Sequence, residues 1–164
     1  MEKIAAVLIA SDSRSAGQRA ELSGPAAEDA LRALGIGVHE IAVVEDEIGP
    51  LAEKMREWSD REDVFLILTS GGTGLAPRDK TPEATRQVIE REVPGIPEML
   101  RAKSLAITPH AALSRAVAGV RKRTLIVNLP GSPKAVTESI EFLAPLLPHA
   151  LDTVAGRAVE CARK

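Results

Sequence analysis

The chain has 164 residues, a formal net charge of −2 at pH 7, and 45% hydrophobic and 27% charged residues. A near-neutral charge argues against a general nucleic-acid-binding surface, and a chain with two Phe, one Trp and no Tyr has few rings on which bases could stack. The lone Cys161 excludes a disulfide framework and a cysteine metal site within one chain. The length favours a single domain spanning residues 1–164.

The first strand is predicted at residues 4–10, a run of seven apolar residues. Such a run is typical of a strand that is buried on both faces of a parallel sheet. The sequence then turns polar, which favours a strand over a signal peptide, and no apolar run is long enough to span a membrane. We therefore expect a cytoplasmic protein that binds neither membrane nor nucleic acid.

The rest of the chain alternates between helices and strands. Residues 11–24 are polar and contain glycine, which predicts a long loop. Further strands are predicted at residues 38–44, 64–68, 117–120 and 124–129. Helices are predicted at residues 25–34, 50–58, 81–91, 98–106 and 134–147, and a short last helix follows a break at Pro148.

This alternation predicts an α/β fold with a doubly wound, mostly parallel sheet and helices on both faces. The hairpin at residues 117–129 would supply the one antiparallel strand. Four helices are expected to begin at a proline soon after a strand: Pro25, Pro50, Pro82 and Pro133. In right-handed βαβ units these helix starts gather at the carboxyl edge of the sheet, where ligands bind. One pocket is therefore expected to be faced by the loops around Asp12, Asp46, Gly72 and Gly131.

Residues 66–83, LILTSGGTGLAPRDKTPE, predict a strand, a glycine-rich turn and the start of a helix. The glycines let the backbone approach a ligand and adopt positive φ. Thr81 is the expected N-cap, and the N–H groups of a helix start favour a phosphate. The loop matches neither the P-loop nor the dinucleotide fingerprint. On these residues alone, a tight turn without a ligand stays the alternative.

Residues 125–134, LIVNLPGSPK, repeat this design. An apolar strand ends at Asn128, whose amide could hydrogen-bond a base or ribose, and Ser132 is expected to cap a helix that opens at Pro133. An ordinary turn is the alternative. Two such loops in one small chain favour a two-part anionic ligand such as a nucleotide.

Asp46 and Asp79 each follow a strand and precede a helix. Carboxylates in such places can hold Mg²⁺, which phosphoryl and nucleotidyl transfer use to neutralise charge. The alternative, which the residues leave open for Asp46, is stabilisation of a helix dipole by about 0.3–1 kcal/mol. Arg78 and Lys80 add cations beside the glycine-rich turn.

Other chemistry is less well supported by the pattern. His39 lies inside a strand and is interpreted as structural, and no two histidines have the spacing of zinc ligands. No serine lies in a nucleophile-elbow pattern, which argues against a Ser-His-Asp hydrolase. The basic turn at residues 121–123 is interpreted as a solvated hairpin tip.

Three segments together resemble the molybdenum-cofactor biosynthesis family: SGGTGLAPRDKTPEAT, VPGIPEML and ALSRAVAGVRKRTLIVNLPGSPKAV. The likeness is greatest to the MogA/MoaB-type molybdopterin adenylyltransferases and to the G domain of gephyrin. Two patterns narrow the resemblance to this branch. One is the ALSR segment at residues 112–115, and the other is an early pattern that consists of Ser11, Asp12, Ser15, Gly17, Ser23, Gly24 and Pro25.

The resemblance implies a homotrimer that uses Mg²⁺ to transfer the adenylyl group of ATP to the terminal phosphate of molybdopterin, with release of pyrophosphate. It further implies that the product is handed to a molybdenum insertase. Asp46 and Asp79 match the family's two catalytic acidic residues and are the expected metal ligands. The expected substrate-binding residues are Ser11, Asp12, Ser70, Gly71, Gly72, Thr73, Gly74, Arg78, Ser114, Asn128, Pro130, Gly131, Ser132 and Lys134.

Three other functions stay open beside this one. The first is a non-catalytic molybdopterin-binding protein on the same scaffold. The second is a structural scaffold, a role that the gephyrin domain also serves by trimerising and that needs further domains. The third is a nucleotide hydrolase, which should turn over ATP without pterin.

Overall fold

The computed structural model describes residues 3–12 and 18–157, with the side chains of residues 18–21 left aside. Ser15, Gly17 and Cys161, which the sequence singled out, lie outside the described residues. Six strands form one sheet in the order β2-β1-β3-β6-β5-β4. The strands are β1 Ile4–Ser11, β2 Gly37–Glu45, β3 Val64–Ser70, β4 Arg91–Glu92, β5 Ala118–Arg121 and β6 Thr124–Leu129.

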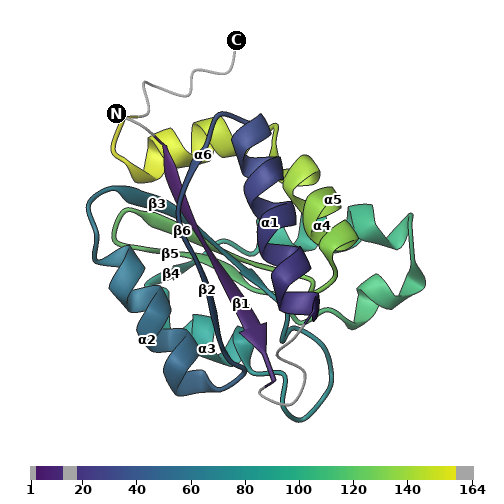
Figure 1. The fold of residues 1–164 in the computed structure, drawn as a ribbon. Helices are drawn as coiled ribbons and strands as arrows, with labels where there is room; N and C mark the ends of the chain where they lie inside the picture. The colour runs from purple at the N-terminus through teal and green to yellow at the C-terminus, as the bar shows by residue number, and fades with distance from the viewer. Residues whose placement is uncertain (1–2, 13–17, 158–164) are drawn as a thin grey trace.

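Helices cover both faces of the sheet (Figure 1). They are α1 Gln18–Ala33, α2 Ile48–Ser59, α3 Thr81–Val88, α4 Gly95–Leu105, α5 Pro133–Leu143 and α6 Leu147–Val154, with a 3-10 helix at Pro109–Leu113. One buried cluster joins α1, α4, α5 and α6 to the sheet, and a second joins α2 and α3 to it. In β1, Val7 and Ile9 belong to the first cluster and Ala6 and Leu8 to the second. This alternation explains why the strand is apolar throughout.

The predicted doubly wound α/β fold is confirmed. β1 pairs in parallel with β2 and β3, and β3 pairs in parallel with β6. β5 is antiparallel to both of its neighbours, so it is the one reversed strand of the sheet. From β1 the chain runs through α1 to β2, which lies on one side of β1, and then through α2 to β3, which lies on the other side of β1. The helices α1 and α2 cover opposite faces of the sheet (Figure 1). The loops that follow β1 and β3 therefore diverge, which opens a crevice at the carboxyl ends of these strands.

The prediction of a loop over residues 11–24 was wrong in its second half, because α1 already begins at Gln18. Pro25 lies inside this helix and does not start it. Ser23 and Gly24 are buried, and a Cβ on Gly24 would stand 2.8 Å from Ile41 Cγ2 of β2. Gly24 therefore serves close packing between helix and sheet, although Ser-Gly-Pro is a sequence typical of loops.

Further boundaries differ from the prediction. α2 begins at Ile48, so Pro50 does not start it, and α4 begins at Gly95 and not at Glu98. α3 ends at Val88, which leaves Arg91–Glu92 free to form the short strand β4 beside β5. α5 ends at Leu143, and Pro148 lies in the first turn of α6, where its missing N–H costs no hydrogen bond. No helix in the described part of the chain has the length and apolar character needed to cross a bilayer.

Candidate active site

A cleft of about 470 Å³ opens at the switch point of the sheet. Most of the residues expected to bind substrate line it, together with Ile9, Ala10, Ser23 and Pro133, which were not among the expected site residues. The expected residues that line it are Ser11, Asp12, Asp46, Ser70, Gly71, Gly72, Thr73, Gly74, Arg78, Asp79, Gly131 and Ser132. The predicted convergence of four loops on one pocket is thus confirmed.

The glycine-rich loop after β3 lies close to its neighbours on both sides. Gly71 has φ +91° and Gly72 has φ +67°, conformations that glycine adopts without strain. A Cβ on Gly71 would stand 2.9 Å from the carbonyl oxygen of Ala10, at the end of β1. The N–H of Gly71 donates to Leu129 O at 3.2 Å, and Thr81 N donates to Gly72 O at 3.1 Å. The loop is therefore tied to β6 on one side and to α3 on the other.

The loop after β6 meets this glycine loop directly. A Cβ on Gly131 would lie 3.3 Å from the Cα of Gly71, and Ser70 Oγ donates to Pro130 O at 3.0 Å. From α1, Ser23 Oγ donates to Gly131 O at 2.8 Å. Ser132 accepts a hydrogen bond from Ala135 N at 3.2 Å, so it caps α5 as predicted. The glycine-rich loop and the loop after β6 thus form one continuous wall.

Asp46 contacts this wall from the turn between β2 and α2, half-buried, with its carboxylate against the Cα of Gly72. A Cβ on Gly72 would stand 2.6 and 2.8 Å from the two carboxylate oxygens of Asp46. Lys80 N donates to Asp46 Oδ1 at 3.0 Å. Burial raises the pKa of Asp46, the nearby Asp79 raises it further, and the hydrogen bond from Lys80 N opposes the rise. A carboxylate held in such surroundings is a candidate functional group.

Asp79 approaches the cleft from the glycine loop itself. Its Oδ2 accepts a hydrogen bond from Ala76 N at 3.0 Å, and a Cβ on Gly74 would stand 2.8 Å from the same oxygen. Arg78, next to it, forms an ion pair with Asp12 across the crevice between β1 and β3. The two predicted carboxylates, Asp46 and Asp79, therefore face one cleft, and the guanidinium of Arg78 lies at its rim.

Thr81 departs from its predicted role. Lys80 is the N-cap of α3 and Thr81 is the first helical residue. The Thr81 hydroxyl is buried and has no hydrogen-bond partner among the described residues. It lies beside Asp46, because a Cβ on Gly72 would stand 2.3 Å from Thr81 Oγ1. A buried oxygen without a partner among the described residues thus lies next to the carboxylate of Asp46.

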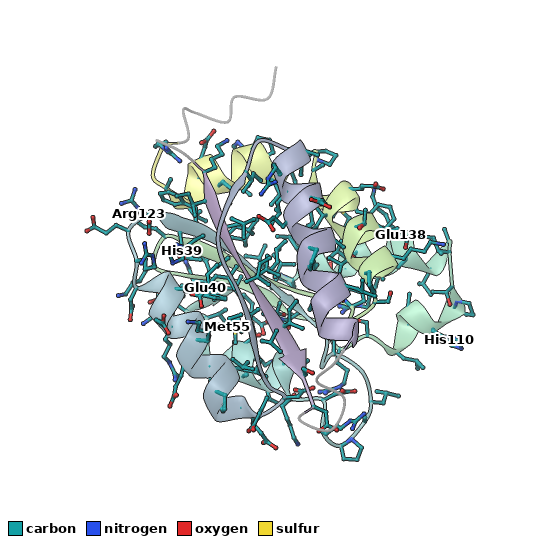
Figure 2. All side chains as sticks on the ribbon, viewed as in Figure 1. His39, Glu40, Met55, His110, Arg123 and Glu138 are labelled. Atoms are coloured by element: carbon teal, nitrogen blue, oxygen red, sulfur yellow. The ribbon has the colours of Figure 1, made fainter. Side chains whose placement is uncertain are left out.

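Some predicted site residues do not line the cleft. Ser114 and Pro130 line an adjacent hollow of about 270 Å³, which shares Thr73 and Gly74 with the cleft as a common wall. This hollow is bordered by the 3-10 helix with His110 and by Glu138 of α5 (Figure 2). The side chain of Lys134 is exposed on α5, and its Nζ lies 3.9 Å from Glu138 Oε1.

Asn128, which was expected to contact a base or ribose, is not among the cleft-lining residues that the structure describes. Its side chain is buried, its Oδ1 accepts from Val117 N at 3.0 Å, and its Nδ2 donates to Thr69 and Thr85 at 2.9 and 2.8 Å. Both amide donors and the carbonyl are thus used inside the fold. Because the strand is buried on both faces, a polar residue near its end faces the interior as readily as the edge.

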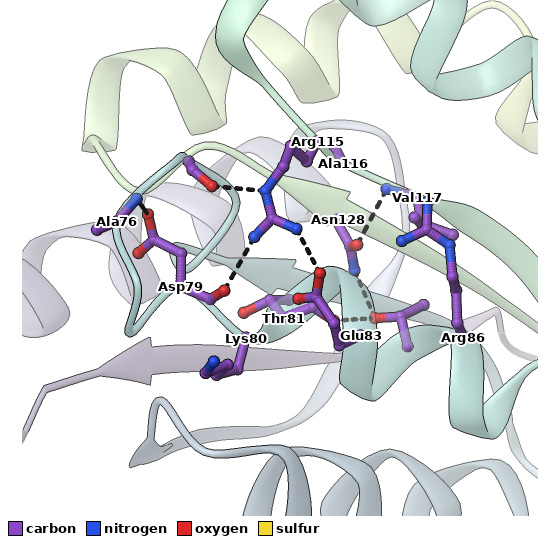
Figure 3. Close-up of polar contacts among 12 residues, drawn as sticks. Ala76, Asp79, Lys80, Thr81, Glu83, Arg86, Arg115, Ala116, Val117 and Asn128 are labelled. Carbon is purple, nitrogen blue, oxygen red and sulfur yellow. Dashed lines mark hydrogen bonds and ion pairs between the residues drawn. The ribbon is translucent and has the colours of Figure 1, made fainter.

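Arg115, which was not among the expected site residues, lies beside the glycine-rich loop (Figure 3). Its guanidinium donates to Gly74 O at 2.7 Å and to Asp79 O at 2.9 Å, and it pairs with the carboxylate of Glu83. This arginine belongs to the ALSR segment, residues 112–115, that contributes to the family resemblance, but its role follows only from these contacts.

The donor set fits a magnesium ion better than zinc. Carboxylate and hydroxyl oxygens, as supplied by Asp46, Asp79 and Thr81, are hard ligands that Mg²⁺ prefers, and Mg²⁺ usually keeps waters and takes phosphate oxygens as well. Within residues 3–12 and 18–157, no group of three His, Cys, Asp or Glu side chains could hold a metal by itself. His39 and His110 lie on opposite sides of the molecule (Figure 2).

Comparison with known proteins decides the family. Residues 6–149 match the family described as "Probable molybdopterin binding domain". The chain belongs to this family. A molybdopterin adenylyltransferase of Helicobacter pylori strain J99 is 38% identical over 160 residues, which are 96% of this chain and 91% of that one. The Drosophila melanogaster protein cinnamon, a molybdenum cofactor synthesis protein, is 48% identical over 122 residues, 74% of this chain and 20% of cinnamon.

Solved structures of related proteins support the same family membership. The molybdopterin biosynthesis Mog protein of Mycobacterium ulcerans aligns with TM-score 0.85 and 39% identity, over 95% of this chain and 99% of that chain. The MoaB enzyme of Thermus thermophilus aligns with TM-score 0.83 and 47% identity, over 95% and 98% of the two chains. The predicted membership of the MogA/MoaB molybdopterin adenylyltransferases, which are nucleotidyltransferases related to gephyrin and cinnamon, is confirmed.

Proposed function

We propose that this protein transfers the adenylyl group of Mg-ATP to the terminal phosphate of molybdopterin. The observation that carries the proposal is the single wall formed by the two loops after β3 and β6, with Asp46 and Asp79 facing the same cleft. Two anionic ligands can meet there, one on each loop. The family membership supports molybdopterin and ATP as these ligands.

The reaction needs no strong base, because the attacking group is already a phosphate. An oxygen of the molybdopterin phosphate forms a bond to the α-phosphorus of ATP, the bond from that phosphorus to the β-bridging oxygen breaks, and pyrophosphate leaves with the electron pair. The difficulty is repulsion, since unscreened charges a few Å apart repel by several kcal/mol at protein-like dielectric. The protein's work is therefore to align two polyanions and offset their charge.

Specific groups in the cleft can do this. The N–H groups at the start of α5, behind the cap of Ser132, favour phosphate, and Arg78 is placed to exchange its Asp12 partner for a phosphate oxygen. Asp46 and Asp79 would hold Mg²⁺, which supplies positive charge against the phosphate oxygens. In this proposal both aspartates act on the cation and on phosphate position and do not carry protons.

The test is a product assay with purified protein, molybdopterin and Mg-ATP. We expect adenylated molybdopterin and one pyrophosphate per product. Asp46→Asn and Asp79→Asn should each lower turnover by about 100-fold or more, while molybdopterin binding persists. Unchanged turnover in both variants would contradict the assigned roles.

The same assay separates the other candidates. A non-catalytic molybdopterin-binding protein would bind the pterin and release no pyrophosphate. A nucleotide hydrolase would consume ATP without pterin. We further propose one domain over residues 1–164, a homotrimer, a cytoplasmic location and delivery of the product to a molybdenum insertase, with no nucleic-acid or membrane partner; sedimentation of the purified protein tests the trimer.

A further inference from the structure

Arg115 joins the two ends of the loop that carries Asp79 (Figure 3). Its Nε donates to Gly74 O at 2.7 Å, and one terminal nitrogen donates to Asp79 O at 2.9 Å. The backbone N–H of Arg115 adds a hydrogen bond of 2.9 Å to Thr73 O. Residues 74–79 are therefore closed into a ring by one planar side chain from another part of the chain.

The position of the Asp79 carboxylate follows from this ring. Asp79 Oδ2 accepts from Ala76 N at 3.0 Å, and Asp79 N donates to Ala76 O at 2.9 Å, so the side chain is folded onto its own loop. Gly74 leaves the room for it, because a Cβ there would stand 2.8 Å from Asp79 Oδ2. Whatever moves Gly74 relative to Asp79 moves the carboxylate in the cleft.

Glu83, on α3, holds the guanidinium from the other side. The third donor of Arg115 pairs with Glu83 Oε1, while Glu83 Oε2 is buried without a partner among the described residues. Burial works against ionisation of Glu83, but the hydrogen bond from Arg115 and further favourable contacts outweigh it and hold the pKa of Glu83 below its usual value. An ionised Glu83 thus fixes the plane of Arg115.

The arrangement requires arginine. Three acceptors lie around one guanidinium, and its planar fork can meet them at once, whereas a lysine ammonium is a point charge on a flexible stem. Arg115 is not part of the cleft lining that the described residues form. It can therefore act on the reaction only through the loop.

We propose that Arg115, oriented by Glu83, is a positioning residue for Asp79. It fixes where the Asp79 carboxylate stands in the cleft and so sets the rate of adenylyl transfer, with little effect on nucleotide binding. The expected effect on the rate rests on the proposed function. The expected effect on the position of the Asp79 carboxylate rests on the loop geometry alone.

The kinetic test uses Arg115→Lys and Glu83→Gln. We expect each to lower kcat by about 10- to 100-fold, since a misplacement of about 1 Å costs on that order, while KM for ATP changes by less than about threefold. Arg115→Lys combined with Asp79→Asn should have the kcat of Asp79→Asn alone, because both changes remove the same contribution.

The matched control is Arg123→Lys. Arg123 also donates from its guanidinium to a backbone carbonyl, Ala155 O at 2.9 Å, but it lies before the start of β6, whereas the cleft is lined by the loop that follows the other end of β6. This variant should keep the kcat of the wild type, and equal melting temperatures for the two arginine variants would show that global stability is not the cause.

A second readout needs no turnover. Amide hydrogen exchange at Ala76 and Asp79 should be at least about tenfold faster in Arg115→Lys and in Glu83→Gln, and unchanged in Arg123→Lys. An inactive wild-type protein would contradict the proposed function, yet the exchange rates would still decide the role of Arg115. Unchanged exchange, unchanged kcat in both variants, or additive losses in the double variant would overturn the proposal; if Arg115→Lys does not fold, Glu83→Gln decides it.

Discussion

The carboxylate of Asp46 lies directly against the Cα of Gly72. A Cβ at this position would stand 2.6 Å from Asp46 Oδ2 and 2.3 Å from the buried hydroxyl of Thr81, and φ of Gly72 is +67°. Gly72, which shapes the glycine-rich loop, is thus also the residue against which a candidate catalytic carboxylate packs. The loop and the carboxylate cannot be changed independently.

We therefore expect Gly72→Ala to abolish most of the adenylyl transfer and to lower the free energy of unfolding by about 1–3 kcal/mol. An alanine is strained at the positive φ of this position, and its Cβ would displace Asp46. Activity assays and urea unfolding measure both effects. Gly95→Ala is the control, because nothing lies within 4 Å of its added Cβ. Full activity in Gly72→Ala would mean that Asp46 need not stay at this position.

Asp46 should oppose stability at neutral pH. Burial is the largest cause that raises its pKa above the unfolded value, with Asp79 and Glu47 adding to it. A carboxyl group with a raised folded pKa stabilises the fold below its unfolded pKa of about 3.9 and loses that contribution as pH rises through the folded value. Asp46→Asn should therefore melt at a higher temperature than the wild type at pH 7.

The difference between Asp46→Asn and the wild type should shrink as pH falls below about 4, where both side chains are neutral. Thermal unfolding followed by circular dichroism from about pH 3.5 to about pH 8 spans this range. A lower melting temperature for Asp46→Asn at pH 7 would show that the ionised carboxylate stabilises the free protein.

Asn128 is expected to matter for stability and not for nucleotide binding. It satisfies Val117 N and the hydroxyls of Thr69 and Thr85, all buried between strands and α3. Asn128→Ala should lower the free energy of unfolding by about 3 kcal/mol, because it leaves buried polar groups unpaired. Calorimetric titration with an ATP analogue should give an unchanged Kd at a temperature where the variant is folded. A higher Kd for the ATP analogue would show that Asn128 does contribute to nucleotide binding.

The sequence predicted those features that depend on local pattern and on topology. Continuous apolar runs identified β1 and β3, and the βα connections placed the loops with Asp46, Gly72 and Gly131 at one edge. Neither inference needs knowledge of side-chain contacts. The predicted cleft therefore agrees with the structure in its main residues.

The features that the sequence did not predict depend on tertiary contacts. The start of α1 is stabilised by burial of Ser23 and by close packing of Gly24 on β2, against the local preference of Ser-Gly-Pro for a loop. Arg115 acts on carbonyl oxygens, which carry no side-chain signature in the sequence. β4 has two residues and exists because β5 offers an edge. Such elements become visible only when the chain is folded.

Ser23 provides the last prediction, because it joins α1 to the loop after β6 through its hydrogen bond of 2.8 Å to Gly131 O. Ser23→Ala should cost about 1 kcal/mol of stability and raise the KM for the ligand on that loop several-fold, with a smaller effect on the ligand of the glycine-rich loop. Steady-state kinetics with ATP and molybdopterin varied in turn measures this asymmetry. Ser139→Ala is the control, since Ser139 donates to Ala135 O inside α5 at 2.7 Å and is not among the cleft-lining residues that the structure describes. If Ser23→Ala raises both KM values equally, the two loops respond as one unit and the assignment of one ligand to each loop is wrong.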